Sequence, residues 1–233
     1  MALKDILVVV DDTPAAVARI DAAAALAARC DAHLVGLYVI VPLVLPAYVE
    51  SQLPEELREA QRIVAEEKAL RASVLFNERI DRVGRLARSE WRMARGDPTE
   101  VVAIQGRYSD LVIVGQIDPD FEAESPLVRA ADLVFECGRP LLIIPYIGQF
   151  PVIGERILIG WNASREAARA VADARPLLVK ARGGTGLCVK PRGGGYGLGD
   201  APEPTLRGIW RIITFAPLPS TFMTATRRSA IFC

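Results

Sequence analysis

Short runs of apolar, often β-branched residues recur along the first 145 residues, and longer helix-favouring stretches separate them. Such runs, bounded by turn residues, are typical of strands buried on both faces of a sheet. The predicted strands lie at residues 6–10, 35–39, 90–94, 111–114 and 141–144. The predicted helices lie at residues 15–29, 54–88, 99–105 and 126–136, the second being either continuous or broken near 76–77. This alternation predicts an α/β fold with an open five-stranded parallel sheet and helices on both faces.

The first strand ends at a polar segment, Asp11-Asp12-Thr13-Pro14. Thr13 is a good residue to cap the following helix, and Pro14 suits a first helical turn. In open α/β sheets, ligands bind beyond the carboxyl ends of the strands, which is where Asp11 lies. A ligand contact by Asp11 and a purely local role at the end of the strand are both compatible with this position.

The hydrophobic pattern then starts again. Residues 157–164 match residues 6–13 at a constant offset of 151, a helix is predicted after them, and a strand is predicted near 186–189. This is a repeat on the scale of a domain. We therefore predict a complete domain at 1–148, a partial second copy at 149–200 and a tail of uncertain fold at 201–233.

The tail differs sharply in composition from the rest of the chain. Residues 204–233 contain no aspartate, glutamate or lysine, and the glycine-rich stretch 193–199 before them opens no recognisable helix. That stretch is typical of a flexible loop more than of a phosphate cradle. The abrupt change is also what translation in a shifted reading frame would produce, and sequencing of the locus would test this.

Charge and composition narrow the range of functions. The chain has 233 residues, of which 51% are hydrophobic, and its 28 basic residues balance its 28 acidic ones, so neither a nucleic-acid nor a membrane partner is expected. The N-terminus lacks a basic leader before its first strand, which favours a cytoplasmic location. The four cysteines are scattered, and His33 is the only histidine, with a packing role expected for it. We therefore predict no metal site and no catalytic residues.

Four stretches in this order resemble the universal stress protein family: Ile6–Pro14, Glu90–Pro98, Tyr108–Gly115 and Arg139–Pro145. Trp161–Ala170 resembles the opening of a second domain in tandem members of that family. The resemblance implies a five-stranded parallel sheet of order 3-2-1-4-5 and a role in surviving stress. It also implies ATP binding in many members, through a phosphate loop that reads Gly-x-x-Gly and, after a spacer, Gly-Ser or Gly-Thr.

That phosphate loop is degenerate in this chain. Gly115 supplies the first glycine, but Asp118 stands at the second, and the Gly-Ser position falls on Leu127-Val128 or Val128-Arg129. Four carboxylates crowd the loop, from Asp118, Asp120, Glu122 and Glu124. Like charges this close repel one another and any phosphate, although Arg129 or bound magnesium would offset part of that repulsion.

The resemblance assigns a vestigial nucleotide site to five residues: Asp11, Asp12, Thr13, Val39 and Gly115. The leading hypothesis is a non-catalytic universal stress protein that needs no cofactor and acts by self-association, as a homodimer, or by partner binding. We expect exposed edges of the incomplete second sheet to favour that pairing. The alternative is a protein that binds adenine nucleotide, ATP with magnesium, and acts as a slow ATPase through a rearranged loop. A hydrolase or transferase lacks support because no nucleophile is accompanied by a base.

Overall fold

The computed structural model describes residues 2–42, 54–120, 128–162, 164–188 and 231–232. The chain divides into two compact units, residues 3–151 with 229–233, and residues 1–2 with 152–228. The first unit contains β1 (Asp5–Val9), α1 (Ala15–Cys30), β2 (His33–Ile40), α3 (Glu55–Asp81), the 3-10 helix η1 (Leu86–Arg88), β3 (Ser89–Arg95), α4 (Pro98–Gly106), β4 (Leu111–Gly115), α5 (Ala130–Glu136), β5 (Leu141–Ile144) and β8 (Ile231–Phe232). The second contains β6 (Arg156–Trp161), α6 (Arg165–Leu178) and β7 (Gly183–Cys188).

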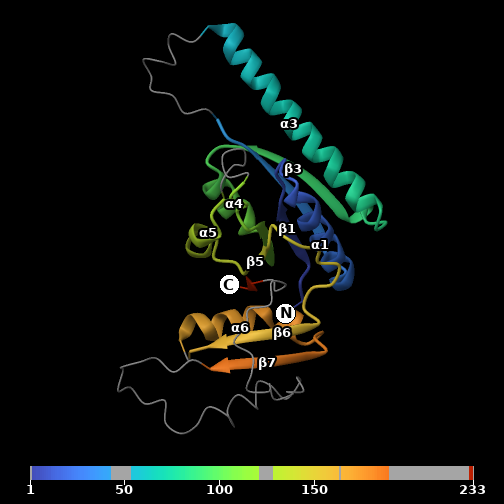
Figure 1. The fold of residues 1–233 in the computed structure, drawn as a ribbon, viewed down its shortest axis with the longest axis vertical. Helices are drawn as coiled ribbons and strands as arrows, with labels where there is room; N and C mark the ends of the chain where they lie inside the picture. The colour runs from blue at the N-terminus through green and yellow to red at the C-terminus, as the bar shows by residue number, and fades with distance from the viewer. Residues whose placement is uncertain (1, 43–53, 121–127, 163, 189–230, 233) are drawn as a thin grey trace. The chain divides into compact units, whose positions relative to one another are not determined.

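The sheet of the first unit has the order β3-β2-β1-β4-β5-β8 (Figure 1). Its first five strands are parallel, which confirms the predicted α/β class and the order 3-2-1-4-5. The sequence did not predict β8, which pairs antiparallel with β5 through Leu142 with Phe232 and Ile143 with Ile231.

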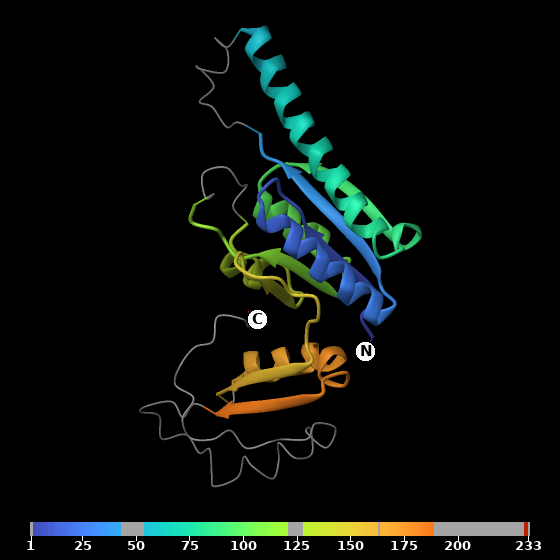
Figure 2. The ribbon, with the colours of Figure 1, turned by 45° about the vertical axis from the view of Figure 1, so that its right-hand side comes forward.

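Helices cover both faces of this sheet, α1 and α3 on one side and α4 and α5 on the other (Figures 1 and 2). The two helix layers are possible because strands β1, β2 and β4 are apolar at nearly every position and therefore bury both faces. One core cluster joins Leu7, Leu37 and Val112 of the strands to Val102 of α4 and Leu133 of α5, and all five side chains are fully buried.

Helix α3 is continuous through residues 76–77, so of the two alternatives the unbroken helix is correct. It does not extend to residue 88, however. Gly84 adopts a left-handed φ of 65°, and the Arg85 amide donates to the Ile80 carbonyl at 3.2 Å, which ends the helix in a tight turn. The chain then enters η1 and β3.

Phe76 anchors α3 on the sheet. Its ring lies over Gly36 of β2, and a Cβ built on Gly36 would be only 2.7 Å from the ring. Trp91 of β3 completes the aromatic contact, with its ring centroid 5.4 Å from that of Phe76 and 6.4 Å from that of Tyr38. The glycine therefore sets how closely α3 approaches the sheet.

The second unit is a β-α-β arrangement in which β6 and β7 pair in parallel. The Asn162 Oδ1 accepts from the Ser164 amide at 3.0 Å, and 151 residues earlier the Asp11 Oδ1 accepts from the Thr13 amide at 3.1 Å. These features have the form expected of a repeated first unit, although common origin of the two stays a prediction. Apart from residues 231–232, the predicted tail lies outside the described residues.

Candidate functional site at the carboxyl ends of β1 and β4

Asp11 lies just beyond the carboxyl end of β1, and Gly115 is the last residue of the neighbouring strand β4. Strand order reverses here. Strands β2 and β3 lie on one side of β1, whereas β4 and β5 lie on its other side. Such a point is where ligands of open α/β sheets bind. Asp11 and Gly115, both predicted site residues, therefore lie at the carboxyl ends of adjacent strands, and ligand binding there stays a prediction.

The Asp11 carboxylate is already occupied by groups of the chain itself. Its Oδ1 accepts from the Thr13 amide at 3.1 Å and from the Thr13 hydroxyl at 2.5 Å. Its Oδ2 accepts from the Arg19 Nη2 at 2.5 Å, and the two side chains of this ion pair are only 11% and 5% exposed. Both carboxylate oxygens thus have strong donors within a nearly closed environment.

Arg19 is a residue of the candidate site that was not predicted from the sequence. It comes from α1, and its guanidinium lies against Gly115, because a Cβ built on Gly115 would overlap Arg19 Nη1. Its Nε is buried without a hydrogen-bond partner in the described part of the chain. A signal was available, since Arg19 lies on the helix face of Ala16 and Ala23, which are both 0% exposed. A charged residue inside an apolar helix stripe needs a buried partner.

The Thr13 prediction needs correction. The Thr13 side chain does not cap α1, where the N-cap position belongs to Pro14 and no side-chain capping bond forms. Its hydroxyl instead donates to Asp11, and Pro14, which follows it, holds the N-cap position. Thr13 contributes its carbonyl, which accepts from the Ala16 amide at 3.0 Å.

The other two predicted residues do not join the Asp11 carboxylate. Asp12 faces α3, where its Oδ2 lies 3.2 Å from Lys68 Nζ. Val39 of β2 is 3% exposed and belongs to the core cluster described above. Of the five predicted residues, Asp11 and Thr13 therefore contact one another, and Gly115 contacts Arg19. Asp12 and Val39 have local roles.

Tyr38 of β2 is buried near the carboxylates of Asp11 and Asp12. Burial of the phenol raises the pKa of Tyr38 to about 12; the charges of Asp12 and Asp11 act in the same direction, and that of Arg71 opposes them. A phenol with so high a pKa remains a neutral hydrogen-bonding group throughout the physiological range.

The loop after β4 is described only in part. The Asp118 Oδ1 accepts from the Asp120 amide at 3.0 Å, so Asp118 organises its own turn. Glu122, Glu124 and Leu127 lie outside the described residues. Val128 and Arg129 precede α5, which begins at Ala130, so the helix predicted from 126 starts later. The backbone of Arg129 is extended, and its side chain does not cap α5.

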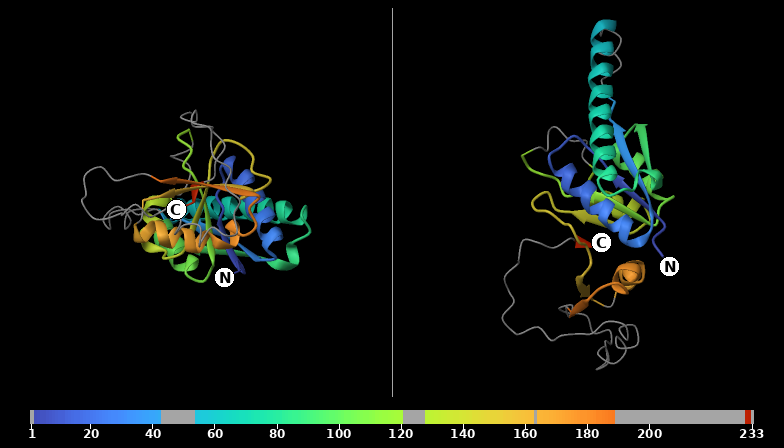
Figure 3. Two further views of the ribbon diagram at one scale, coloured as in Figure 1. Left: turned by 90° about the horizontal axis from the view of Figure 1, so that it is seen from below. Right: turned by 90° about the vertical axis from the view of Figure 1, so that its right-hand side faces the viewer.

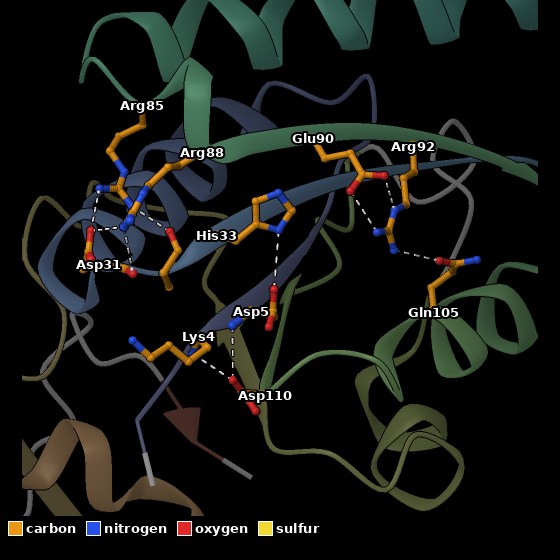
Figure 4. A network of polar contacts seen from close by, with 11 residues as sticks. Lys4, Asp5, Asp31, His33, Arg85, Arg88, Glu90, Arg92, Gln105 and Asp110 are labelled. Carbon is orange, nitrogen blue, oxygen red and sulfur yellow. Dashed lines mark hydrogen bonds and ion pairs between the residues drawn. The ribbon is translucent and has the colours of Figure 1, made fainter.

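A second group of polar residues lies at the opposite end of the strands, where β1, β2 and β4 begin (Figure 4). The Asp110 Oδ2 accepts from the Lys4 and Asp5 amides at 2.7 and 3.1 Å. His33 Nδ1 lies 3.5 Å from Asp5 Oδ1, with the histidine side chain 38% exposed. His33 therefore lies partly in solvent beside a carboxylate, in place of the packing role expected for it.

Two further observations on the described residues concern metal binding and membrane insertion. No group of three or more histidine, cysteine, aspartate or glutamate residues is arranged to hold a metal ion among them. No helix in the described ranges has both the length and the apolar character needed to cross a membrane.

Comparison with known proteins places these features in context. Residues 2–118 match the model of the universal stress protein family. A universal stress protein from Archaeoglobus fulgidus DSM 4304 is 14% identical, with a TM-score of 0.60 over 89% of this chain and 71% of that chain. The universal stress protein UspA from Lactobacillus plantarum is 20% identical, with a TM-score of 0.48 over 62% of this chain and 98% of the other.

A family protein from Burkholderia pseudomallei is 25% identical, with a TM-score of 0.42 over 61% of this chain and 96% of the other. The search of curated proteins found no match. The similarity to the Archaeoglobus protein is a similarity of fold.

Proposed function

Because this chain belongs to the universal stress protein family, we propose that it is a stress-response module that acts by self-association or partner binding and not by catalysis. The observation that carries the proposal is the buried contact of Arg19 with Asp11 and Gly115. We propose that this contact occupies the position, beyond the carboxyl ends of β1 and β4, at which a nucleotide would otherwise bind.

A nucleotide at this edge would have to compete with the chain's own groups. Asp11 already accepts three hydrogen bonds, so a base that needed more than its one remaining lone pair would have to displace Thr13 or Arg19, each 2.5 Å away. Separating a buried ion pair leaves an uncompensated charge, at a cost of about 3–5 kcal/mol. A ligand would have to offset that cost before it gained any net affinity.

The remaining parts of the proposal concern organisation and location. We propose that residues 149–200 are a partial second copy of the first domain, and that the protein acts in the cytoplasm. The 151-residue offset between the turns at Asp11 and Asn162 supports the first of these. In that second copy Ala170 stands where the first has Arg19, so the copy lacks the buried pair.

Calorimetric titration of the native chain with ATP and magnesium tests the proposal. We expect no binding in the micromolar range. A micromolar dissociation constant that disappears in an Asp11→Ala variant would contradict it. Arg62→Ala is the matched control, because it removes an exposed arginine of α3 outside both the Asp11 contact and the loop after β4.

The second candidate function is adenine-nucleotide binding with Arg19 as the cation that holds a phosphate. One observation favours it, the buried Arg19 Nε that has no acceptor in the described residues. An arginine is well suited to phosphate because its planar fork donates in pairs. If this candidate is correct, the native chain and Arg62→Ala will bind ATP while Arg19→Ala will not, with circular dichroism verifying that each variant is folded.

A further inference from the structure

Helix α3 is much longer than the surface that it covers. It has 27 residues, and its buried side chains are Ala69, Ala72, Phe76 and Ile80. None of residues 55–68 is buried. At about 1.5 Å per residue, that half of the helix spans roughly 20 Å. Figures 1 and 3 show this half projecting beyond the sheet.

The side of α3 that faces away from the sheet carries large apolar side chains. Four of these apolar side chains are about half exposed or more: Ile63 at 44%, Val64 at 51%, Leu70 at 64% and Val74 at 48%. At 100° per residue they lie on the half of the helix opposite Ala69 and Phe76. A helix with apolar residues on both sides is typical of one that has a second packing partner.

A shallow depression marks the centre of this outer face. It is lined by Leu70, Arg71, Val74, Leu75 and Glu78. Arg71 and Glu78 flank the apolar side chains, are both exposed, and form no ion pair with another residue in the described ranges. They are two helical turns apart, about 10 Å along the axis, so they do not reach one another within one chain.

This arrangement of charge is self-complementary. If a second α3 lies antiparallel to the first, with a two-fold axis between Val74 and Leu75, each Arg71 lies opposite the partner's Glu78. The same axis brings Val74 opposite the partner's Leu75 and Glu67 opposite the partner's Arg82. A two-fold contact uses the same patch on both subunits, so one helix supplies both members of each pair.

We infer that the outer face of α3, defined by Ile63, Val64, Leu70, Arg71, Val74 and Glu78, is the surface through which two copies of this chain associate. The inference rests on the self-association proposed above and identifies its surface. It differs from the expectation that edges of the second sheet pair. The projecting residues 55–68 then extend toward the partner's turn after α3, where Val83 and Leu86 are 46% and 44% exposed.

The charges of α3 favour a protein partner over an anionic lipid surface. The helix carries seven acidic and five basic residues, so its net charge is negative. An anionic membrane attracts clusters of lysine and arginine, which this helix does not present. A second copy satisfies both the apolar side chains and the opposite charges without any other molecule.

Charge reversal tests this surface in a way that loss of folding cannot imitate. Arg71→Glu places glutamate opposite the partner's Glu78, and Glu78→Arg places arginine opposite the partner's Arg71. Each variant alone should raise the dimer dissociation constant at least tenfold in sedimentation velocity. An equimolar mixture of the two should restore association, because each new charge then faces its opposite. The double variant on one chain should also associate.

Two apolar variants complete the experiment. Leu70→Ser with Val74→Ser should weaken the dimer at least tenfold, whereas Phe135→Ser, which alters a side chain of α5 that is 89% exposed, should leave it unchanged. Leu158→Lys in β6 tests the edge of the second sheet. A native dimer that only Leu158→Lys or Phe135→Ser dissociates, or a mixture that stays monomeric, overturns the α3 surface while self-association stands. A native chain that is monomeric at tens of micromolar overturns both.

Discussion

Arg19 Nη2 lies 2.5 Å from Asp11 Oδ2, and this ion pair is enclosed between α1 and the carboxyl ends of β1 and β4. The pair joins a helix to the strand that precedes it, at the sheet edge where this fold class binds ligands. The ion pair therefore has a structural role, to which our proposal adds the exclusion of a ligand, and stability and binding measurements separate the two.

The first prediction concerns stability. Arg19→Met retains the apolar stem but leaves Asp11 as an unpaired buried charge, so we expect a loss of about 3–5 kcal/mol in the free energy of unfolding. Urea denaturation followed by circular dichroism measures it. Asp11→Asn combined with Arg19→Met should lose less than the two single losses added together, because the double variant buries no charge.

Arg62→Met is the matched control for that variant. Arg62 forms ion pairs with Glu59 at 2.6 Å and Glu66 at 2.8 Å, but it is exposed on α3. Exposed pairs contribute little because water and salt screen them. An Arg62→Met variant as unstable as Arg19→Met would show that loss of any arginine, and not burial of the pair, causes the effect.

The second prediction concerns the contact of α3 with the sheet. Gly36→Ala would bring a Cβ within 2.7 Å of the Phe76 ring, which is fully buried and has no free space to enter. Overpacking of this kind costs about 1–3 kcal/mol. Urea unfolding of a Trp161→Phe, Trp210→Phe background, monitored by the remaining fluorescence of Trp91, is the appropriate measurement, since Trp91 contacts Phe76. Gly160→Ala, where a Cβ would meet nothing, should leave stability unchanged.

The third prediction concerns alkaline pH. Because the pKa of Tyr38 is raised to about 12 from a value near 10 in the unfolded chain, the folded state holds the phenol proton more tightly. The stabilisation is complete below pH ~10 and is lost as pH rises toward ~12. Tyr38→Phe should reduce the fall in stability over that range. Tyr108→Phe is the control, because Tyr108 is 78% exposed, and an equal effect from it would contradict the assignment.

The fourth prediction concerns thiol reactivity. Burial raises the pKa of Cys137, whose residue is 2% exposed, so little thiolate forms at neutral pH. Iodoacetamide labelling with peptide mapping should modify Cys137 at least tenfold more slowly than Cys30, which is partly exposed. The difference should vanish in denaturant. Equal rates in the native protein would show that Cys137 is accessible.

The sequence predicted the strands well, because strands buried on both faces leave a continuous apolar run. Residues 141–144 were predicted and observed with identical bounds. Helix ends were harder to predict, since the left-handed turn at Gly84 and not any change in periodicity ends α3. The pairing of β5 with β8 could not be predicted, because neither segment carries a local signal for a contact across so much chain.

The positions of Asp11 and Gly115 at adjacent strand ends were predicted, but the contacts that surround them were not. Asp11 and Gly115 follow from the topology of an open sheet, whereas the role of Arg19 depends on which face of α1 is buried. Thr13 was assigned to a cap because local propensity favours it, but α1 begins one residue too late for Thr13 to occupy the N-cap position. The spacing of Arg71 and Glu78 acquires meaning only once α3 is known to bury its opposite side.

The pairing of β5 with β8 also has a consequence for the order of events during synthesis. Residues 145–230 separate the two strands, so β5 leaves the ribosome long before its outer neighbour exists. A domain that folds as it is made would pass through a stage in which β5 is an open edge. Open edges recruit other strands, which makes nascent chains at this stage the species most exposed to aggregation and to chaperones.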